Sequence, residues 1–166
     1  MEMAVDKTEL KHRLVLGTAQ FGMAYGIANH SGQPDQMLAN DILVVAWENG
    51  IRILDTAQAY GESEVVLGKF FECHPECQFE VITKLAPDVD ITSVDEISSA
   101  VIGSNKNLGQ KPLALLLHNY KQLHFWDGIL GDTLRAMMEL GEIRHLGVSL
   151  YHPDVNPFLQ VYLCFL

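Results

Sequence analysis

The stretch GIRILDTAQAYGESE, residues 50–64, decides the fold of this 166-residue chain. It begins with an apolar run, Ile51 to Leu54, that ends in Asp55, and Tyr60 follows five residues later beside Gly61. Such a run is typical of a buried strand, and functional side chains gather on the loops that follow strand ends. We therefore predict that Asp55 and Tyr60 point into one pocket at the end of a strand.

Short apolar runs of strand length alternate with amphipathic segments along the chain. This alternation is typical of βα units that build a parallel sheet. Successive runs start between 27 and 39 residues apart, which is the length of one βα unit. The predicted strands lie at residues 13–17, 52–55, 79–84, 113–118 and 143–149.

The amphipathic segments carry the start and stop signals of helices. Helices are predicted between Asp35 and Gly50, over 62–71, between Ser93 and Gly109, and over 129–140. Ser93 and Glu96 match a capping box, in which two side chains and two backbone amides bond reciprocally. In the first helix the predicted apolar side consists of Leu38, Ile42, Val45 and Ala46.

Two architectures have this repeat. An open doubly wound sheet carries a glycine-rich phosphate-binding turn after its first strand, but residues 17–22, GTAQFG, do not fit G-x-G-x-x-G. A (βα) barrel collects reactive residues from several strand ends, as this sequence does, and takes about 250 residues when complete. We predict an α/β fold, an incomplete (βα)8 TIM barrel of about five strands. It forms a single truncated domain, 1–166, with at most one further strand at 160–166.

The composition excludes several classes of protein. Apolar residues make up 48% of the chain and charged residues 19%, which is the composition of a folded globular protein. The formal net charge is −10, and the scattered basic residues argue against a nucleic-acid partner. The polar start and the short apolar runs predict neither a signal peptide nor a membrane span. We expect a soluble cytoplasmic protein.

The cysteines and histidines do not predict a metal site. Cys73, Cys77 and Cys164 leave an odd thiol, which favours a reducing compartment. Residues 73–77, CHPEC, have no second ligand pair at zinc-finger spacing. A metal-dependent barrel hydrolase that uses His118 and Asp55 is disfavoured, because no His-x-His or similar paired-ligand motif is present.

Ionisable residues mark the ends of three successive strands. Asp55, Lys84 and His118 end the second, third and fourth predicted strands, and Tyr60 lies just beyond the first of these. Burial of one such group alone is costly, whereas a mutually paired set offsets that cost. A lysine ammonium near a phenol favours the ionised phenol, whose ordinary pKa is about 10. The set therefore suits a reaction that protonates an oxygen as it becomes negative.

At this point the sequence resembles a known family. The match covers about residues 13–152, and the segment Asp-Thr-Ala-x-x-Tyr-Gly-x-Ser-Glu is its most specific part. The matching pieces stand in the same order and at similar spacing in the aldo/keto reductases. They are LGTAQFG at 16–22, DTAQAYGESE at 55–64, ITK at 82–84, LLH at 116–118 and IRHLGVS at 143–149.

The resemblance implies a (βα)8 barrel that reduces an aldehyde or a ketone to an alcohol with NADPH. Tyr60 would be the general acid, Lys84 and Asp55 would tune it, and His118 would orient the small carbonyl substrate. The cofactor NADP(H) would lie near Gly17, Thr18, Asp55 and Ser149. Leu150 stands where many members of the family have asparagine after that serine.

The length of the chain leaves a second hypothesis open. In the family, the loops of the seventh and eighth strands supply most contacts to the cofactor's pyrophosphate, adenine and 2′-phosphate, so NADP(H) binding is expected to be weakened here. An unclosed sheet also keeps two unpaired edges. The alternative to a reductase is therefore a non-catalytic fragment of a barrel that associates with itself or with a partner through these edges.

Overall fold

A computed structural model describes residues 14–26, 29 and 32–150 of the chain. Five strands form one sheet in the order β1-β2-β3-β4-β5, and every neighbouring pair is parallel. The α/β class and the five predicted strands are confirmed, while the sixth strand predicted at 160–166 lies outside the described residues. The strands are β1 (Val15–Gly17), β2 (Ile53–Asp55), β3 (Glu80–Leu85), β4 (Ala114–Leu117) and β5 (Leu146–Val148).

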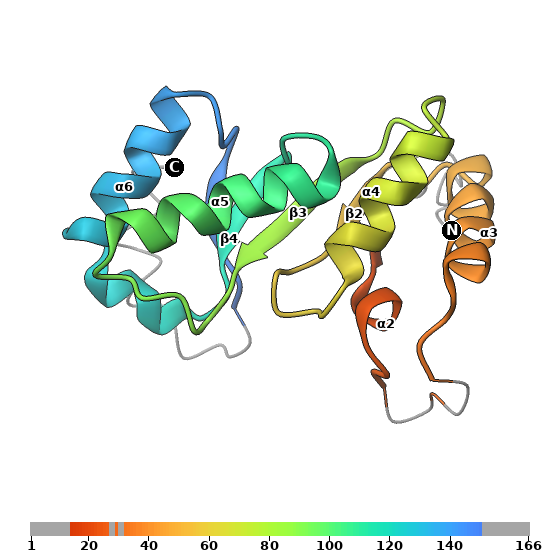
Figure 1. Cartoon of the computed structure of the whole chain (residues 1–166), viewed down its shortest axis with the longest axis horizontal. Helices are drawn as coiled ribbons and strands as arrows, with labels where there is room; N and C mark the ends of the chain where they lie inside the picture. Colours follow the sequence, from red (N-terminus) through yellow and green to blue (C-terminus); the bar gives the residue numbers. More distant parts are fainter. Residues whose placement is uncertain (1–13, 27–28, 30–31, 151–166) are drawn as a thin grey trace, which may run out of the picture.

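Helices connect the strands and cover the outer side of the sheet (Figure 1). The four predicted helices are confirmed as α3 (Gln36–Glu48), α4 (Ser63–Cys73), α5 (Val94–Leu108) and α6 (Ile129–Glu139). Two shorter elements were not predicted: α2 (Ala19–Gly22) and a 3-10 helix, η1 (Tyr120–Phe125). Each is too short to show an apolar period in the sequence. None of the described helices is long and apolar enough to cross a bilayer.

The residues predicted to cap the helix ends do so in most cases. Asp35 Oδ1 accepts a hydrogen bond of 2.8 Å from the Leu38 amide at the start of α3, and Gly50 ends that helix with φ +86°. At α5, Ser93 Oγ accepts from the Glu96 amide. The reciprocal half of the predicted capping box is absent, because the Glu96 carboxylate accepts from the amide of Asp90 instead.

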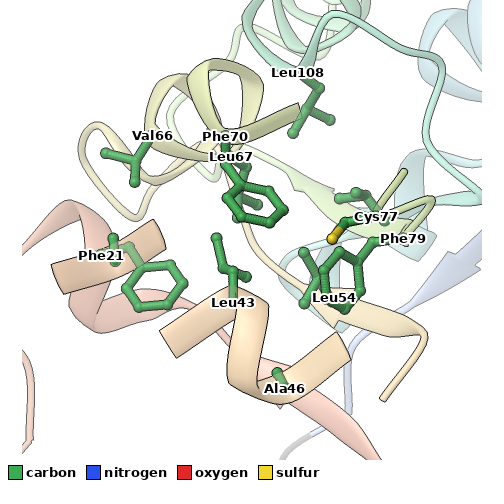
Figure 2. Packing of buried hydrophobic residues seen from close by; sticks show 12 residues of the cluster. Phe21, Leu43, Ala46, Leu54, Val66, Leu67, Phe70, Cys77, Phe79 and Leu108 are labelled. Carbon is green, nitrogen blue, oxygen red and sulfur yellow. The ribbon is translucent and has the colours of Figure 1, made fainter. Parts of the chain in front are cut away.

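Buried apolar side chains form two clusters between the sheet and its helices. The first lies beneath α3 and α4 and is shown in Figure 2, where Leu43, Leu54 and Phe70 meet. The second lies beneath α5 and α6 and includes Leu115 and Leu134. The core therefore sits on the helix-covered side of the sheet.

The predicted apolar side of α3 is wrong for three of its four residues. Leu38, Ile42 and Val45 are exposed by 51%, 37% and 56%, whereas only Ala46 of that set is buried. The buried residues of the helix are Ala39, Leu43 and Ala46. The helix carries apolar residues around most of its circumference, so periodicity could not decide which side faces the sheet.

The side-chain alternation of the strands separates the two faces of the sheet. Leu54, Val81 and Leu115 are buried against the helices. The residues that alternate with them, such as Ile53 and Ile82, are only half-buried on the other, concave face. By the same alternation Asp55 and Lys84 belong to the concave face, and so does His118 just beyond β4.

Candidate active site

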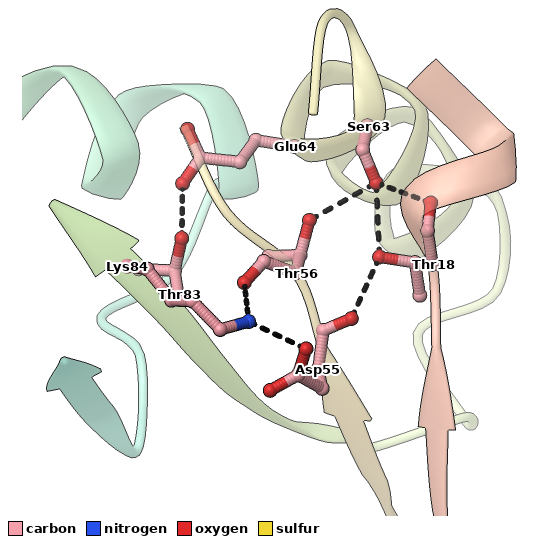
Figure 3. Close-up of polar contacts among 7 residues, drawn as sticks. All are labelled: Thr18, Asp55, Thr56, Ser63, Glu64, Thr83 and Lys84. Atoms are coloured by element: carbon pink, nitrogen blue, oxygen red, sulfur yellow. Dashed lines mark hydrogen bonds and ion pairs between the residues drawn. The ribbon is translucent and has the colours of Figure 1, made fainter. Parts of the chain in front are cut away.

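The ammonium of Lys84 is the centre of the candidate site (Figure 3). Its Nζ atom lies 2.5 Å from Asp55 Oδ1 and 2.8 Å from the backbone carbonyl of Thr56. Lys84 is 4% exposed, so its charge is almost fully removed from water. A buried ammonium is tolerated when an opposite charge and further acceptors surround it, and the two acceptors supply that environment.

Tyr60 and His118 complete the predicted set around Lys84. The Lys84 Nζ atom lies 5.0 Å from the centre of the Tyr60 ring, which is a cation–π distance. The rings of Tyr60 and His118 meet edge to face, with centres 6.1 Å apart. The structure therefore brings together all four residues predicted from the strand ends.

His118 is electrically neutral near pH 7. Burial lowers the pKa of its imidazole from the ordinary value of 6.5, the charge of Lys84 lowers it further, and Asp55 opposes both effects. Its Nδ1 atom is buried and has no hydrogen-bond partner among the described residues. A buried polar atom without a partner is costly, so this atom is a candidate for contact with a bound molecule.

The loop that carries Tyr60 is fastened to the end of β3. The amide of Thr56 donates to Ile82 O at 2.8 Å, and that of Gln58 donates to Lys84 O at 3.2 Å. Gly22 of α2 lies so close to the same loop that a Cβ atom there would stand 1.6 Å from Tyr60 O. The position of Tyr60 thus depends on a glycine in the GTAQFG segment.

A chain of buried hydroxyl groups links the ends of β1 and β2 to the start of α4. The hydroxyl of Thr56 donates to Ser63 Oγ at 3.0 Å, and Ser63 Oγ donates to Thr18 O at 2.9 Å. Thr18 in turn donates to Asp55 O from both its amide and its hydroxyl. Sequence reasoning missed the roles of Thr56 and Ser63, although both stand inside the DTAQAYGESE motif.

The remaining predicted cofactor residues lie at neighbouring strand ends. Gly17 is exposed, pairs in register with Asp55, and has no atom within 4 Å of the place a Cβ would take. Ser149 is half-buried, and its amide donates to Leu117 O at 2.9 Å. Thr18 is fully buried, and besides the bonds of the hydroxyl chain its carbonyl accepts from the Phe21 amide at 2.9 Å. Leu150 is 38% exposed.

The CHPEC segment lies away from the candidate site. Cys73 is exposed and Cys77 is buried, and burial raises the pKa of the Cys77 thiol. Within the described ranges, no group of three His, Cys, Asp or Glu residues is placed to hold a metal ion. A cavity of about 360 Å³ lined by Cys77, Glu80 and Arg144 lies at the opposite end of the sheet, where the strands begin. The paired ionisable groups lie at the other end, where the strands end, and that end is the candidate active site.

Comparisons with known proteins agree with this geometry. The model of the aldo/keto reductase family matches residues 13–156. D-arabinose 1-dehydrogenase of Saccharomyces cerevisiae is 28% identical over 158 residues, which are 90% of this chain and 46% of that protein. The chain thus spans about half the length of this relative.

Solved structures show the same fold. A structure described as an aldo-keto reductase of Pseudomonas aeruginosa is 30% identical, with a TM-score of 0.69 over 81% of this chain and 54% of that one. A Bombyx mori aldo-keto reductase in complex with NADP is 22% identical, with a TM-score of 0.65 over 90% of this chain and 50% of that one. The five strands and their helices therefore correspond to an incomplete barrel of this kind.

Proposed function

Because this chain belongs to the aldo/keto reductase family, we propose that it serves the NADP(H)-dependent reduction of an aldehyde or ketone to an alcohol. One observation carries the proposal: Asp55, Tyr60, Lys84 and His118 converge at one end of the sheet. Three of them come from different strand ends, which is where barrel enzymes carry their reactive groups. The substrate is a small carbonyl compound.

Tyr60 is the general acid of the proposed reaction. Its hydroxyl gives a proton to the carbonyl oxygen as negative charge develops there. The ammonium of Lys84, close to the Tyr60 ring, stabilises the phenolate that remains. Asp55 and the Thr56 carbonyl hold that ammonium in place. When bound, NADPH supplies the hydride.

His118 orients the carbonyl group. A neutral imidazole donates one hydrogen bond and does not compete with Tyr60 as an acid. The lowered pKa of His118 keeps it in that neutral form at pH 7. Its Nδ1 atom, buried without a partner in the described part of the chain, gives the imidazole a free position for contact within the pocket.

The residues present fit the reacting end of NADP(H). The backbone of Gly17 is open to a ligand, and Asp55 and Ser149 lie at neighbouring strand ends. Thr18 supports this seat through its two hydrogen bonds to Asp55 O. The set reaches only one end of a long dinucleotide, so we expect the cofactor to bind weakly.

The test compares the chain with Tyr60→Phe by following NADPH oxidation over a panel of aldehydes. We expect the substitution to lower kcat about 10²- to 10⁴-fold, which is the usual contribution of a general acid. Tyr25→Phe is the matched control, because Tyr25 is 57% exposed and lies outside the set. Equal rates for the chain and Tyr60→Phe would refute the role of Tyr60.

Exposed apolar residues at one edge favour a second candidate function, self-association through the sheet edges. β1 pairs only with β2 among the described strands, and Leu14 and Val15 are exposed by 55% and 47%. Met37 and Leu38, at the start of helix α3, are exposed by 71% and 51%. Unpaired edges of this kind pair readily with another chain.

Sedimentation velocity tests the second candidate. We expect a dimer or larger species that Val15→Lys shifts toward monomer, since a charge at an edge strand blocks pairing. A wild-type chain that sediments as a monomer at all concentrations would exclude it.

A further inference from the structure

Glu64 is a buried carboxylate that lies outside the reacting set. It is the second residue of α4 and is 4% exposed. Its Oε1 atom accepts a hydrogen bond from Thr83 Oγ1 on β3 at 2.6 Å (Figure 3). The same atom accepts from Ser104 Oγ on α5 at 2.7 Å. One carboxylate oxygen thus ties together two helices and the central strand.

The contacts of Glu64 extend to the loop that carries Tyr60. Gln58, two residues before Tyr60, donates from Nε2 to Ser104 Oγ at 2.8 Å and to Ala100 O at 3.0 Å. Its Oε1 accepts from the amide of Ala86, just after β3, at 2.7 Å. A continuous series of hydrogen bonds therefore runs from the Tyr60 loop through Ser104 and Glu64 to Thr83.

This series of hydrogen bonds ends next to Tyr60 and Lys84 in the chain, on the side of the sheet that faces the helices. Thr83 directly precedes Lys84, and successive strand residues point to opposite faces. Thr83 bonds to Glu64 beneath the helices, while Lys84 bonds to Asp55 on the concave face. Glu64 therefore touches neither substrate nor cofactor.

The carboxylate of Glu64 has no basic partner to offset its burial. No Lys, Arg or His side chain in the described residues forms an ion pair with it. Its position in the first turn of α4 gives partial compensation, because the helix dipole stabilises negative charge there. The two hydroxyl donors, with Asn107 Nδ2 at 3.4 Å from Oε2, supply the rest. Charge and hydrogen bonds thus hold Thr83 and Ser104 to one point.

We propose that Glu64 is a positioning residue that fixes the Tyr60 loop and the Lys84 strand relative to one another. The proposal rests on the proposed function of Tyr60 and Lys84. It predicts that loss of the carboxylate impairs the chemical step and leaves substrate binding nearly unchanged.

The test uses three variants of the full chain: Glu64→Ala, Glu64→Gln and Gln110→Ala. Gln110 is the matched control, because it bonds to Phe79 O and so joins the end of α5 to the opposite end of β3. We expect Glu64→Ala to lower kcat about 10- to 100-fold, the effect of a small misplacement, with KM nearly unchanged. Glu64→Gln should recover most of the rate, since its amide oxygen accepts both hydroxyl groups. Gln110→Ala should keep the wild-type kcat.

A readout that needs no turnover separates this proposal from the proposed function. The imidazole of His118 faces Lys84, Asp55 and Tyr60, and the charge of Lys84 lowers its pKa. If Lys84 is no longer held in place, the pKa of His118, followed by NMR, should rise in Glu64→Ala and stay at the wild-type value in Gln110→Ala. An inactive wild type would count against the proposed function, while the NMR titration would still decide on positioning.

Two results would overturn the proposal. A folded Glu64→Ala chain with wild-type kcat and an unchanged His118 titration would do so. If Glu64→Ala does not fold, Thr83→Val takes its place, because it removes one of the two hydroxyl donors to Glu64 and keeps the side-chain shape. Wild-type behaviour of Thr83→Val in both readouts would then overturn it.

Discussion

Helices α3 and α4 both follow a strand and pack on the same apolar cluster, yet they differ in how much of each helix is buried. Six of the eleven residues of α4 are buried, among them Ser63 and Glu64, whereas α3 buries three of thirteen. α4 packs against helices α2, α3 and α5, so neighbours surround it, while α3 packs mainly against α4.

The contrast shows where this fold builds its chemistry. The first turn of α4 reaches the strand ends through Ser63, which bonds to Thr18, and Glu64, which bonds to Thr83. In the first turn of α3, Gln36 bonds to Val66 O of α4, and Met37 and Leu38 are exposed. The first turn of α4 therefore holds the candidate strand ends in place, whereas the first turn of α3 contacts a neighbouring helix and presents apolar side chains.

The largest loss of stability should come from a substitution in the buried helix α4. Phe70 of α4 is fully buried, stacks on His74 and lies 6.1 Å from the Phe79 ring centre. Phe70→Ala should lower the free energy of unfolding by about 3–5 kcal/mol, the usual cost of removing a buried aromatic ring. Urea unfolding followed by circular dichroism measures it. A loss below about 1 kcal/mol would contradict the buried position of this helix.

A pair of leucines in α3 tests which of its sides faces the sheet. Leu43 is fully buried and Leu38 is 51% exposed. Leu43→Ala should cost about 2–4 kcal/mol, and Leu38→Ala should change stability by less than about 0.5 kcal/mol. The same urea experiment compares them. Equal losses would mean that the edge helix is covered on both sides and would remove the contrast with α4.

Two glycines should respond to alanine with opposite signs. A Cβ atom at Gly22 would meet Tyr60 O at 1.6 Å, whereas one at Gly103 in α5 would meet nothing within 4 Å. Gly22→Ala should destabilise by about 1–3 kcal/mol because the Tyr60 loop must move. Gly103→Ala should stabilise by about 0.5–1 kcal/mol, the helix propensity difference. Thermal melts of both variants decide, and a neutral Gly22→Ala would show that the loop is not held by α2.

The smallest effect concerns His118 on the concave face, which neither helix covers. His118 binds a proton less readily in the folded chain than in the unfolded chain, because the fold lowers the pKa of its imidazole from 6.5. Its contribution to stability is therefore present above pH 6.5 and is lost as the pH falls from there toward the folded pKa. Urea unfolding against pH should show this loss, and His118→Gln should reduce it. A steeper loss in the variant would reverse the sign and exclude the lowered pKa.

A related measurement identifies the source of the shift. Lys84→Met removes a positive charge that lowers the pKa of His118, so the NMR-detected pKa should rise. Asp55→Asn removes the one cause that raises it, and the pKa should fall. An unchanged pKa of His118 in both variants would show that burial, the largest cause, sets the value alone.

Much of the fold and the convergence of the four candidate residues could be predicted from the sequence. Strand ends are marked by a change from apolar to ionisable residues, and Asp55, Lys84 and His118 stand at such changes. Because parallel strands end at one edge of the sheet, residues that stand at strand ends in the sequence are expected to lie close together in the fold. The motif around Tyr60 then supplied the fourth member.

The remaining features depend on tertiary contacts that no local pattern encodes. The apolar residues of α3 surround the helix, so its inward side is set by where β1 and α4 lie. The capping box at Ser93 is half-formed because the Glu96 carboxylate accepts a hydrogen bond from the amide of Asp90 and not from the amide of Ser93. The partners of Glu64 come from β3 and α5, 19 and 40 residues away. The spacing of these residues in the sequence does not indicate that they contact Glu64.

The two described acceptors of Lys84 differ in what a substitution can remove. The Asp55 carboxylate belongs to a side chain, whereas the carbonyl of Thr56 belongs to the main chain and remains when the Thr56 side chain is replaced. Loss of the Asp55 carboxylate would therefore take away the counter-charge of a buried ammonium and leave only a neutral acceptor beside it. Mutation can thus reach the charge balance around the cation, while the main-chain acceptor is set by the fold.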